Sequence, residues 1–342
     1  MSDPFSNTKP GAVLCFGELL LRICPDADGN WLNQNNLPFY IAGAELNAAT
    51  ALALWGVPAK YFTVLPDNHL SAQLVGHLQK KNIDTTPIFY NGDRVGLYYL
   101  TPGKDMKNNA LIYDRAHSSF AELKPGTVDW DKVLDGISWF HFSAICPAVS
   151  QNMAEVCEEV LQAAANRGIT ISVDLNYRAK LWQYGKSPQQ IMPGLIKYCN
   201  LVMGNIWAAE TLLGILPDIT EAADKTAYLN AAQKTSAQII EQYPACKAVA
   251  NTFRFDAGPI HYYSTLATID DFYTSAEYQS ETIIDKVGSG DCFMAGLIYG
   301  FYNHIGTRQT LDFATAAAFK KLFIPGDVTN KSVEEITKSI KL

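Results

Sequence analysis

The 342-residue chain carries a formal net charge of −7, with 27 lysines and arginines against 34 aspartates and glutamates. This acidic balance argues against nucleic acid as a partner, because a duplex-binding protein needs a basic surface that displaces counterions from phosphates. Hydrophobic residues make up 48% and charged residues 18% of the chain, which is typical of a globular protein and not of a disordered one.

The sequence predicts neither a membrane span nor a secretory leader. No apolar run approaches the ~20 residues that cross a bilayer, and the N-terminus, MSDPFSNTKPGA, is polar and acidic, unlike a signal peptide. The seven cysteines form no CxxC pair and the six histidines occur singly. We therefore expect buried free thiols in a reducing cytosol, without a disulfide framework or a zinc site built by the protein.

Short apolar or β-branched runs alternate with longer helical segments along the chain. The pattern predicts strands at 13–23, 61–66, 137–144, 168–176 and 247–253. It predicts helices at 44–56, about 71–81, 151–167, 220–242, 291–304 and 308–322. This alternation favours a mainly parallel sheet covered by helices on both faces. No repeat or low-complexity linker marks a boundary, so we expect one domain over 1–342.

The segment 94–115 breaks this alternation. Two alternating strands flank a turn rich in Pro, Gly and Asn, which predicts a hairpin. Together with 38–42 the hairpin would make a small antiparallel sheet inserted into the α/β body, with lid segments at about 34–43 and 92–117. A projecting sheet suits a lid that excludes water from a reaction. The alternative is a surface hairpin without a role.

The segment DKVGSGDCFMAGLIYG, 285–300, is the strongest candidate for chemistry. Gly288, Ser289 and Gly290 precede Asp291, and an apolar-periodic helix is expected to begin at once, near 291. Glycines allow several N–H groups to point at one anion, and a helix N-terminus adds partial positive charge. An aspartate at the mouth of such a cradle can accept the proton of an attacking hydroxyl during phosphoryl transfer. The alternative is an aspartate that only caps the helix.

Two other nucleotide-binding motifs, the phosphate-binding loop and the dinucleotide-binding fingerprint, are incomplete or absent in the sequence. The tripeptide GKS at 185–187 looks like the end of a phosphate-binding loop, but Lys180 stands where that loop needs its first glycine. No strand is followed by GxGxxG and a helix, so a dinucleotide-binding site is not predicted either.

The segments DKVGSGDCFMAG and AGAELNAATALALWG, about 240 residues apart, resemble the two signatures of the PfkB (ribokinase-like) carbohydrate kinases. The resemblance extends from FGELLLR (16–22) to FKKLFIPGD (319–327). It implies a three-layer α/β/α sandwich with a mainly parallel central sheet and a small β-sheet lid. It also implies phosphoryl transfer from ATP, with Mg²⁺ held mainly by nucleotide phosphates and water, as this hard ion prefers.

Carried over by position, the resemblance implies a role for each residue of the two signatures. Asp291 would be the base, and the amides of Gly288, Ser289 and Gly290 would form the anion hole. Gly43 and Asn47 would line the sugar site. The nucleotide and its cation would lie near Asn205, Asp285, Gly288 and Gly290, along the 247–253 strand and the 316–327 segment.

One departure from the family pattern concerns magnesium. Relatives often carry N-x-x-E, whereas GNIWAAE places Ala208 three residues after Asn205 and Glu210 two further on. Either Glu210 takes the role after a local shift, or Asn205 and water suffice, so no protein ligand for the metal is assigned.

Side chains of the hairpin and of one strand end indicate which class of substrate the site would bind. Side chains alternate along a strand, so Tyr113 and Arg115 share a face, whereas Tyr98 and Tyr99 point to opposite faces. Arg178 lies just beyond the strand that ends at Asp174, where open α/β sheets bind ligands. Arginines and tyrosine hydroxyls facing one pocket suit a carboxylate. Arginines in solvent-facing ion pairs are the alternative.

The same segments, with GELLLR, RVGLYYL, IYDRA, DLNYR-x-x-LW and IPGD, resemble the 2-keto-3-deoxygluconate (KDG) kinases within this family. The resemblance implies KDG as the substrate, with its C6 hydroxyl at Asp291 and its acid end near Arg178 and Arg115. Members of that subgroup contact the sugar acid through positions equivalent to Gly43, Tyr98, Tyr113, Arg115, Arg178 and Asp291. Lid sheets in the family often pair between subunits, which implies a homo-oligomer. A fructokinase or other sugar kinase, and a non-catalytic sugar sensor, are the alternatives.

Overall fold

The computed structural model describes residues 3–6, 8, 10–26, 28–101, 111–219, 224–256 and 258–341. Within them the main sheet has ten strands, with β16 (Tyr278–Ser280) paired to β14. The order of the other nine is β15 (Phe272–Thr274), β14 (Ile260–Thr268), β13 (Ala248–Phe255), β12 (Leu201–Gly204), β11 (Thr170–Asp174), β10 (Ile137–Ser143), β1 (Ala12–Phe16), β4 (Ala59–Phe62) and β6 (Ile83–Asp84). The pairings from β6 across to β13 are parallel, whereas β14 pairs antiparallel with β13, β15 and β16.

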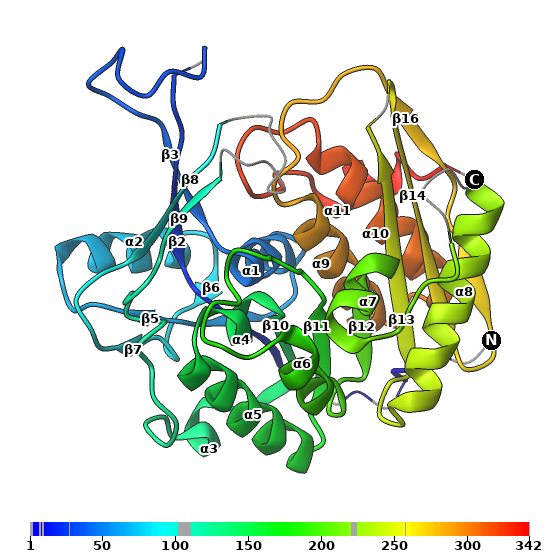
Figure 1. The fold of residues 1–342 in the computed structure, drawn as a ribbon, viewed down its shortest axis with the longest axis horizontal. Coiled ribbons are helices and arrows are strands. Elements are labelled where there is room, and N and C mark those ends of the chain that lie inside the picture. Colours follow the sequence, from blue (N-terminus) through cyan, green and yellow to red (C-terminus); the bar gives the residue numbers. More distant parts are fainter. Residues whose placement is uncertain are drawn as a thin grey trace.

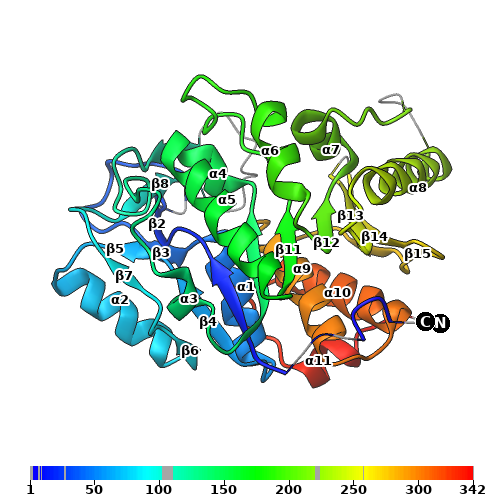
Figure 2. The ribbon, with the colours of Figure 1, turned by 90° about the horizontal axis from the view of Figure 1, so that it is seen from below.

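Helices cover both faces of this sheet (Figure 2). One face packs against α1 (Ala44–Leu54), α2 (His69–Gln79), α9 (Ser289–Tyr302), α10 (Thr307–Lys321) and α11 (Val333–Thr337). The other packs against α3 (Trp130–Val133), α4 (Ile145–Val149), α5 (Gln151–Asn166), α6 (Pro188–Ile196), α7 (Ile206–Leu213) and α8 (Lys225–Gln242). The chain therefore forms the expected three-layer α/β/α sandwich with a mainly parallel sheet.

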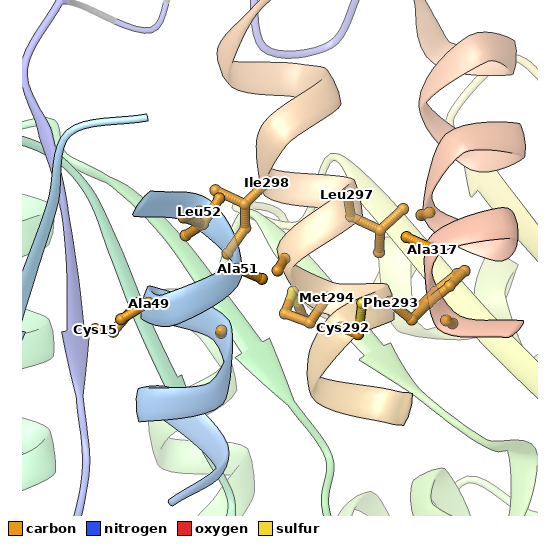
Figure 3. Packing of buried hydrophobic residues seen from close by; sticks show 14 of the residues in the cluster. Cys15, Ala49, Ala51, Leu52, Cys292, Phe293, Met294, Leu297, Ile298 and Ala317 are labelled. Atoms are coloured by element: carbon orange, nitrogen blue, oxygen red, sulfur yellow. The ribbon is translucent and has the colours of Figure 1, made fainter. Parts of the chain in front are cut away.

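Close packing of α9 against its neighbours fixes the position of its N-terminus. Figure 3 shows α9 between α1 and α10, with Ile298 beside Leu52 on one side and Leu297 and Phe293 facing the α10 side. A Cβ atom at Gly296 would lie 2.6 Å from Ala314 Cα, which real contacts do not allow. The absence of a side chain there lets α9 and α10 approach closely. This close packing holds α9 rigidly, and with it the GSGD segment at its N-terminus.

Two predicted strands are each interrupted. The 13–23 run forms β1 and then β2 (Leu20–Ile23), which belong to different sheets, and the 61–66 run forms β4 and then β5 (Val64–Leu65). β5 pairs with β7 (Phe89–Tyr90) outside the main sheet. Both runs are mostly apolar and mostly buried, and such a run gives little periodic signal for the point at which a chain leaves one sheet for another.

The small sheet consists of β3 (Phe39–Ala42), β2, β8 (Gly96–Tyr99) and β9 (Ile112–Asp114), in that order. Its β3–β2 and β8–β9 pairs are antiparallel, but β2 and β8 are parallel. The expectation of an antiparallel sheet was wrong, because β2 arrives from the main sheet and inserts between the two predicted pieces. Figure 1 shows this sheet at one end of the molecule, beside α1. The predicted turn, 102–110, lies outside the described residues.

The other predicted elements agree with the structure to within a few residues, and the predicted 220–242 helix is described from Lys225. Helix α1 ends before Gly56, whose φ of +81° belongs to the left-handed region. All seven cysteines are buried and free, as expected. In the described part of the chain, no helix combines the length and apolarity that crossing a membrane requires.

Candidate active site

A cavity of about 580 Å³ opens where the small sheet meets the carboxyl ends of the parallel strands. Ligands of open α/β sheets bind at this edge. Its wall includes the N-termini of α1 and α9, the residues that follow β11 and β12, the C-terminal half of β13, and three strands of the small sheet. All ten sequence-predicted catalytic and sugar-binding residues line it: Gly43, Asn47, Tyr98, Tyr113, Arg115, Arg178, Gly288, Ser289, Gly290 and Asp291.

Helix α9 begins at Ser289, earlier than predicted, with Gly288 as its N-cap at a φ of +79°. Asp291 is therefore the third residue of the helix and neither precedes nor caps it. A Cβ atom at Gly288 would lie 1.8 Å from the carbonyl oxygen of Asp327, so only glycine fits. Because the first N–H groups of a helix have no intrahelical acceptor, those of the Ser289 turn are available to an anion.

The Ser289 side chain takes no part in this cradle. Its hydroxyl donates a 3.0 Å hydrogen bond to the carbonyl oxygen of Ala318 on α10. This bond ties the first turn of α9 to the neighbouring helix and leaves the serine amide, rather than its hydroxyl, as the group for an anion.

Asp291 is bonded to α1 across the cavity. Asn47 Nδ2 donates a hydrogen bond of 2.6 Å to Asp291 Oδ2. Burial raises the pKa of Asp291 to about 7; the hydrogen bond from Asn47 opposes this shift, and the nearby Glu45 carboxylate adds to it. A carboxylate whose pKa lies near neutrality is suited to accept a proton from an alcohol.

Two further acids on the wall were not predicted as site residues. Glu45, in the first turn of α1, accepts a 2.5 Å hydrogen bond from Ser143 Oγ, and burial raises its pKa. Asp174 ends β11, and burial followed by the Asp291 charge raises its pKa well above the usual value. Both had a signal in the sequence, since Glu45 lies inside the first signature and Asp174 ends a predicted strand. A Cβ atom at Gly17 would lie 2.0 Å from Glu45 Oε2, so this glycine makes room for the carboxylate.

The small sheet presents alternate side chains to the cavity, as predicted. Tyr98 is buried and its hydroxyl donates a 2.9 Å hydrogen bond to Asp327 Oδ2, whereas Tyr99 contacts Trp31 instead. Tyr113 lines the cavity, and the intervening Asp114 pairs with Arg94 at 2.7 Å.

Arg115 reaches the cavity already paired. Its Nε donates a 2.8 Å hydrogen bond to Glu18 Oε2, and its Nη2 contacts the same oxygen. Glu18 also lines the cavity and was not predicted as a site residue. Because a carboxylate neutralises Arg115, this arginine brings the site less net positive charge than the sequence suggested.

The loop after β11 carries Arg178, which lines the cavity and donates a 3.0 Å hydrogen bond from Nη1 to the carbonyl oxygen of Tyr177. Asn205 also lines the cavity, as the N-cap of α7, and its Oδ1 accepts a 2.8 Å hydrogen bond from the Ala208 amide. Glu210, left open as a magnesium-site residue, is not part of the cavity wall.

Asp285 is buried behind the glycine loop and does not line the cavity. Its Oδ2 lies 2.8 Å from Nη2 of the fully buried Arg22, whose same nitrogen lies 3.1 Å from Asp327 Oδ1. Its Oδ1 accepts a 3.0 Å hydrogen bond from the Val287 amide. Asp285 therefore supports the loop that leads into the N-terminus of α9.

Within the described residues, no three His, Cys, Asp or Glu side chains are grouped so that they could hold a metal ion. Of the residues that the resemblance placed near the nucleotide and the metal, some lie on the cavity wall and one is buried behind it. Asn205, Gly288 and Gly290 are on the wall, and Asp285 is behind it.

The model of the pfkB family of carbohydrate kinases matches residues 11–252 of the chain. A crystal structure of 2-dehydro-3-deoxygluconokinase from Thermotoga maritima is 34% identical, covers 96% of this chain and 98% of its own, and superposes with a TM-score of 0.86. The 2-dehydro-3-deoxygalactonokinase of Haloferax volcanii is 25% identical over 96% of both chains. A fructokinase from Xylella fastidiosa with bound ATP is 19% identical, covers 97% of this chain and 98% of its own, and has the same fold at a TM-score of 0.71.

Proposed function

Since the chain belongs to the pfkB family of carbohydrate kinases, we propose that it phosphorylates the 6-hydroxyl of KDG with ATP, giving KDG 6-phosphate. The observation that carries this proposal is the position of Asp291. It lies on the cavity wall in the first turn of a glycine-capped helix, and its pKa is raised to about 7.

In the proposed reaction, the sugar hydroxyl oxygen attacks the γ-phosphorus while Asp291 accepts the hydroxyl proton. The new phosphorus–oxygen bond forms as the bond from the γ-phosphorus to the bridging oxygen breaks, and ADP leaves with that electron pair. Backbone amides of Gly288, Ser289 and Gly290 stabilise the negative charge on the phosphoryl oxygens. Asn47 holds the Asp291 carboxylate in place through their 2.6 Å hydrogen bond.

ATP is the proposed phosphoryl donor, with Mg²⁺ as the cofactor. The amides of the α9 N-terminus, the glycine at 288 that a Cβ atom would block, and Asn205 on the cavity wall fit a bound phosphate chain. Mg²⁺ when bound would neutralise phosphate charge, and it would be held mainly by phosphate oxygens and water. Asn205 is the described residue placed to orient that water.

The sugar-acid substrate is supported by relatives and by the cavity. The Thermotoga protein and the Haloferax protein are named for 2-dehydro-3-deoxygluconate (KDG) and 2-dehydro-3-deoxygalactonate, which differ in configuration at C4. Arg178, Tyr98 and Tyr113 line the same cavity as Asp291 and provide donors for a carboxylate and hydroxyls. The acid end would lie near Arg178, with Arg115 contributing through its remaining N–H groups.

An ADP-release assay across KDG, 2-keto-3-deoxygalactonate, fructose and ribose tests the proposal. We expect the highest kcat/KM with KDG.

In Asp291→Asn, kcat should fall by ~10²–10⁴, because the general base is lost, while ADP and KDG still bind. A variant that keeps the wild-type rate would rule out this base. Ligand-dependent melting shifts without phosphate transfer to any sugar would instead indicate a sensor.

We also propose a cytoplasmic location, a single domain, and a homodimer that pairs through the small sheet acting as a lid. Phe39 of β3 and Ile112 of β9 are large apolar side chains that are exposed on this sheet. Burying them against a second copy would remove apolar area from water. Light scattering of the purified protein tests the dimer, and Ile112→Asp should shift it towards monomer.

A further inference from the structure

Arg254, Asp256 and Lys286 form a cluster of ion pairs beside the proposed anion hole. Lys286 Nζ lies 2.5 Å from Asp256 Oδ2, and Arg254 Nε lies 3.4 Å from Asp256 Oδ1. Arg254 belongs to the end of β13, and Lys286 lies two residues before the N-cap Gly288. One carboxylate thus joins two cations that come from different walls of the cavity.

The two cations, and not the acid, line the cavity. The side chains of Lys286 and Arg254 are 19% and 24% exposed, whereas Asp256 is 33% exposed and is absent from the wall. Lysine is rarely covered to this degree unless it is paired. The trio carries a net charge of +1, presented next to the loop that leads into Gly288.

We propose that Arg254 and Lys286, oriented by Asp256, bind the non-transferred phosphates of the nucleotide, an inference that rests on the proposed kinase function. The anion hole at the α9 N-terminus can serve the phosphoryl group in transfer, but the rest of the phosphate chain carries further negative charge. The planar guanidinium and the ammonium are the side chains that match phosphate oxygens. A carboxylate behind them restricts their rotamers, which lowers the entropy lost on binding.

The arginine on the small-sheet wall, Arg115, does not offer the same charge. Arg115 is paired with Glu18, and Tyr113 lies beneath its guanidinium at 5.8 Å from the ring centre. The positive charge at 254 and 286 therefore distinguishes the end of the cavity formed by β13 and the α9 loop from the end formed by the small sheet. With Arg178, in the loop after β11, assigned to the sugar carboxylate, this difference assigns phosphates to the first end and the sugar to the second.

Calorimetric titration with ADP and with adenosine tests the inference. In Lys286→Met and in Arg254→Met, the Kd for ADP should rise about tenfold or more, since a charge-assisted hydrogen bond is lost. The Kd for adenosine should stay within about twofold, because it has no phosphate. Lys286→Arg should keep ADP binding near wild type, which separates loss of the cation from a folding defect. Lys197→Met, which removes an exposed lysine paired with Glu158 on the far helix layer, is the matched control.

Steady-state kinetics give a second readout. KM for ATP should rise in both methionine variants, while KM for the sugar acid stays near wild type. ADP affinity that is unchanged in folded Lys286→Met and Arg254→Met would overturn the phosphate assignment while leaving the kinase proposal intact. Failure of the wild-type protein to bind ADP or transfer phosphate would instead overturn the kinase proposal itself.

Discussion

Asn47 Nδ2 donates a 2.6 Å hydrogen bond to Asp291 Oδ2, which joins the N-terminal part of α1 to the first turn of α9. These two residues come from signatures about 240 positions apart in the chain. The bond fixes the carboxylate at the cavity wall. It also favours the charged form of Asp291, against a burial effect that raises its pKa to about 7.

The pH dependence of kcat/KM should report this balance. Asp291 must be deprotonated to accept a proton, so the rate should fall as the pH drops through about 7. Asn47→Ala removes a bond that stabilises the charged form, so the acid limb should move to higher pH by about one unit. Profiles of kcat/KM between pH 5 and 9, at saturating ATP, measure the shift.

Asn303→Ala is the control for this experiment, because Asn303 follows the opposite end of α9 and donates to the Tyr299 carbonyl oxygen. Its profile should overlay the wild type. An acid limb of Asn47→Ala that stays in place or moves to lower pH would contradict the role assigned to the hydrogen bond.

Comparing alanine substitutions at Gly288 and Gly185 separates the effect of backbone strain from the effect of a steric clash. Both adopt left-handed φ values, +79° and +85°. A Cβ atom at Gly288 would lie 1.8 Å from the Asp327 carbonyl oxygen, whereas one at Gly185 would meet nothing within 4 Å. Gly185→Ala should therefore cost only about 1–2 kcal/mol of stability, with activity intact.

Gly288→Ala must in addition move the loop away from Asp327. Because this displaces the amides of the anion hole, kcat should fall by ~10² or more, with a larger loss of stability than in Gly185→Ala. Denaturant unfolding and steady-state rates on the two variants give the comparison. Equal activities would show that the loop does not need its present conformation.

Where a local pattern is present in the sequence, the residues that it singles out lie on the wall of one cavity. The run GSGD predicts the cradle and the base, the resemblance carried by GAELN predicts Gly43 and Asn47, and all of these residues lie on the cavity wall. Alternation along the hairpin predicts that Tyr98 and Tyr99 face opposite sides, and the family resemblance assigns Tyr98 to the cavity, which it lines. The glycine-rich cradle and the alternation need only neighbouring residues and the geometry of one element, whereas Gly43, Asn47 and Tyr98 were assigned by the family resemblance.

Pairings between distant segments were not predictable in the same way. Glu18 neutralises Arg115 across 97 positions, and Arg22 reaches Asp285 across 263. The break after β1 was missed because 13–23 is mostly apolar and was taken as one buried strand, although Gly17 and Glu18 interrupt the apolar residues just where β1 ends. The Glu18–Arg115 and Arg22–Asp285 contacts depend on tertiary packing, for which a single sequence holds no local signal.

Arg178→Ala should distinguish a sugar acid from a neutral sugar. Loss of a charge-assisted hydrogen bond to a carboxylate predicts a KM for KDG about tenfold higher or more, while KM for fructose changes less than about twofold. Arg167→Ala, which removes an exposed arginine paired with Asp131, should change neither value. Equal rises in KM for the two sugars would argue against carboxylate recognition by Arg178.

Arg22→Met tests whether the buried ion network supports the anion-hole loop. Arg22 is 0% exposed and lies within 2.8 Å of Asp285 and 3.1 Å of Asp327. Removing it leaves two buried carboxylates without their cation, which typically costs about 3–5 kcal/mol. Arg167→Met breaks an exposed pair and should cost less than about 1 kcal/mol. Urea unfolding at pH 7 gives both values. Because Asp285 holds the Val287 amide next to Gly288, kcat of folded Arg22→Met should also fall. A stability loss no larger than in Arg167→Met would show that the network is not what holds this loop against the small sheet.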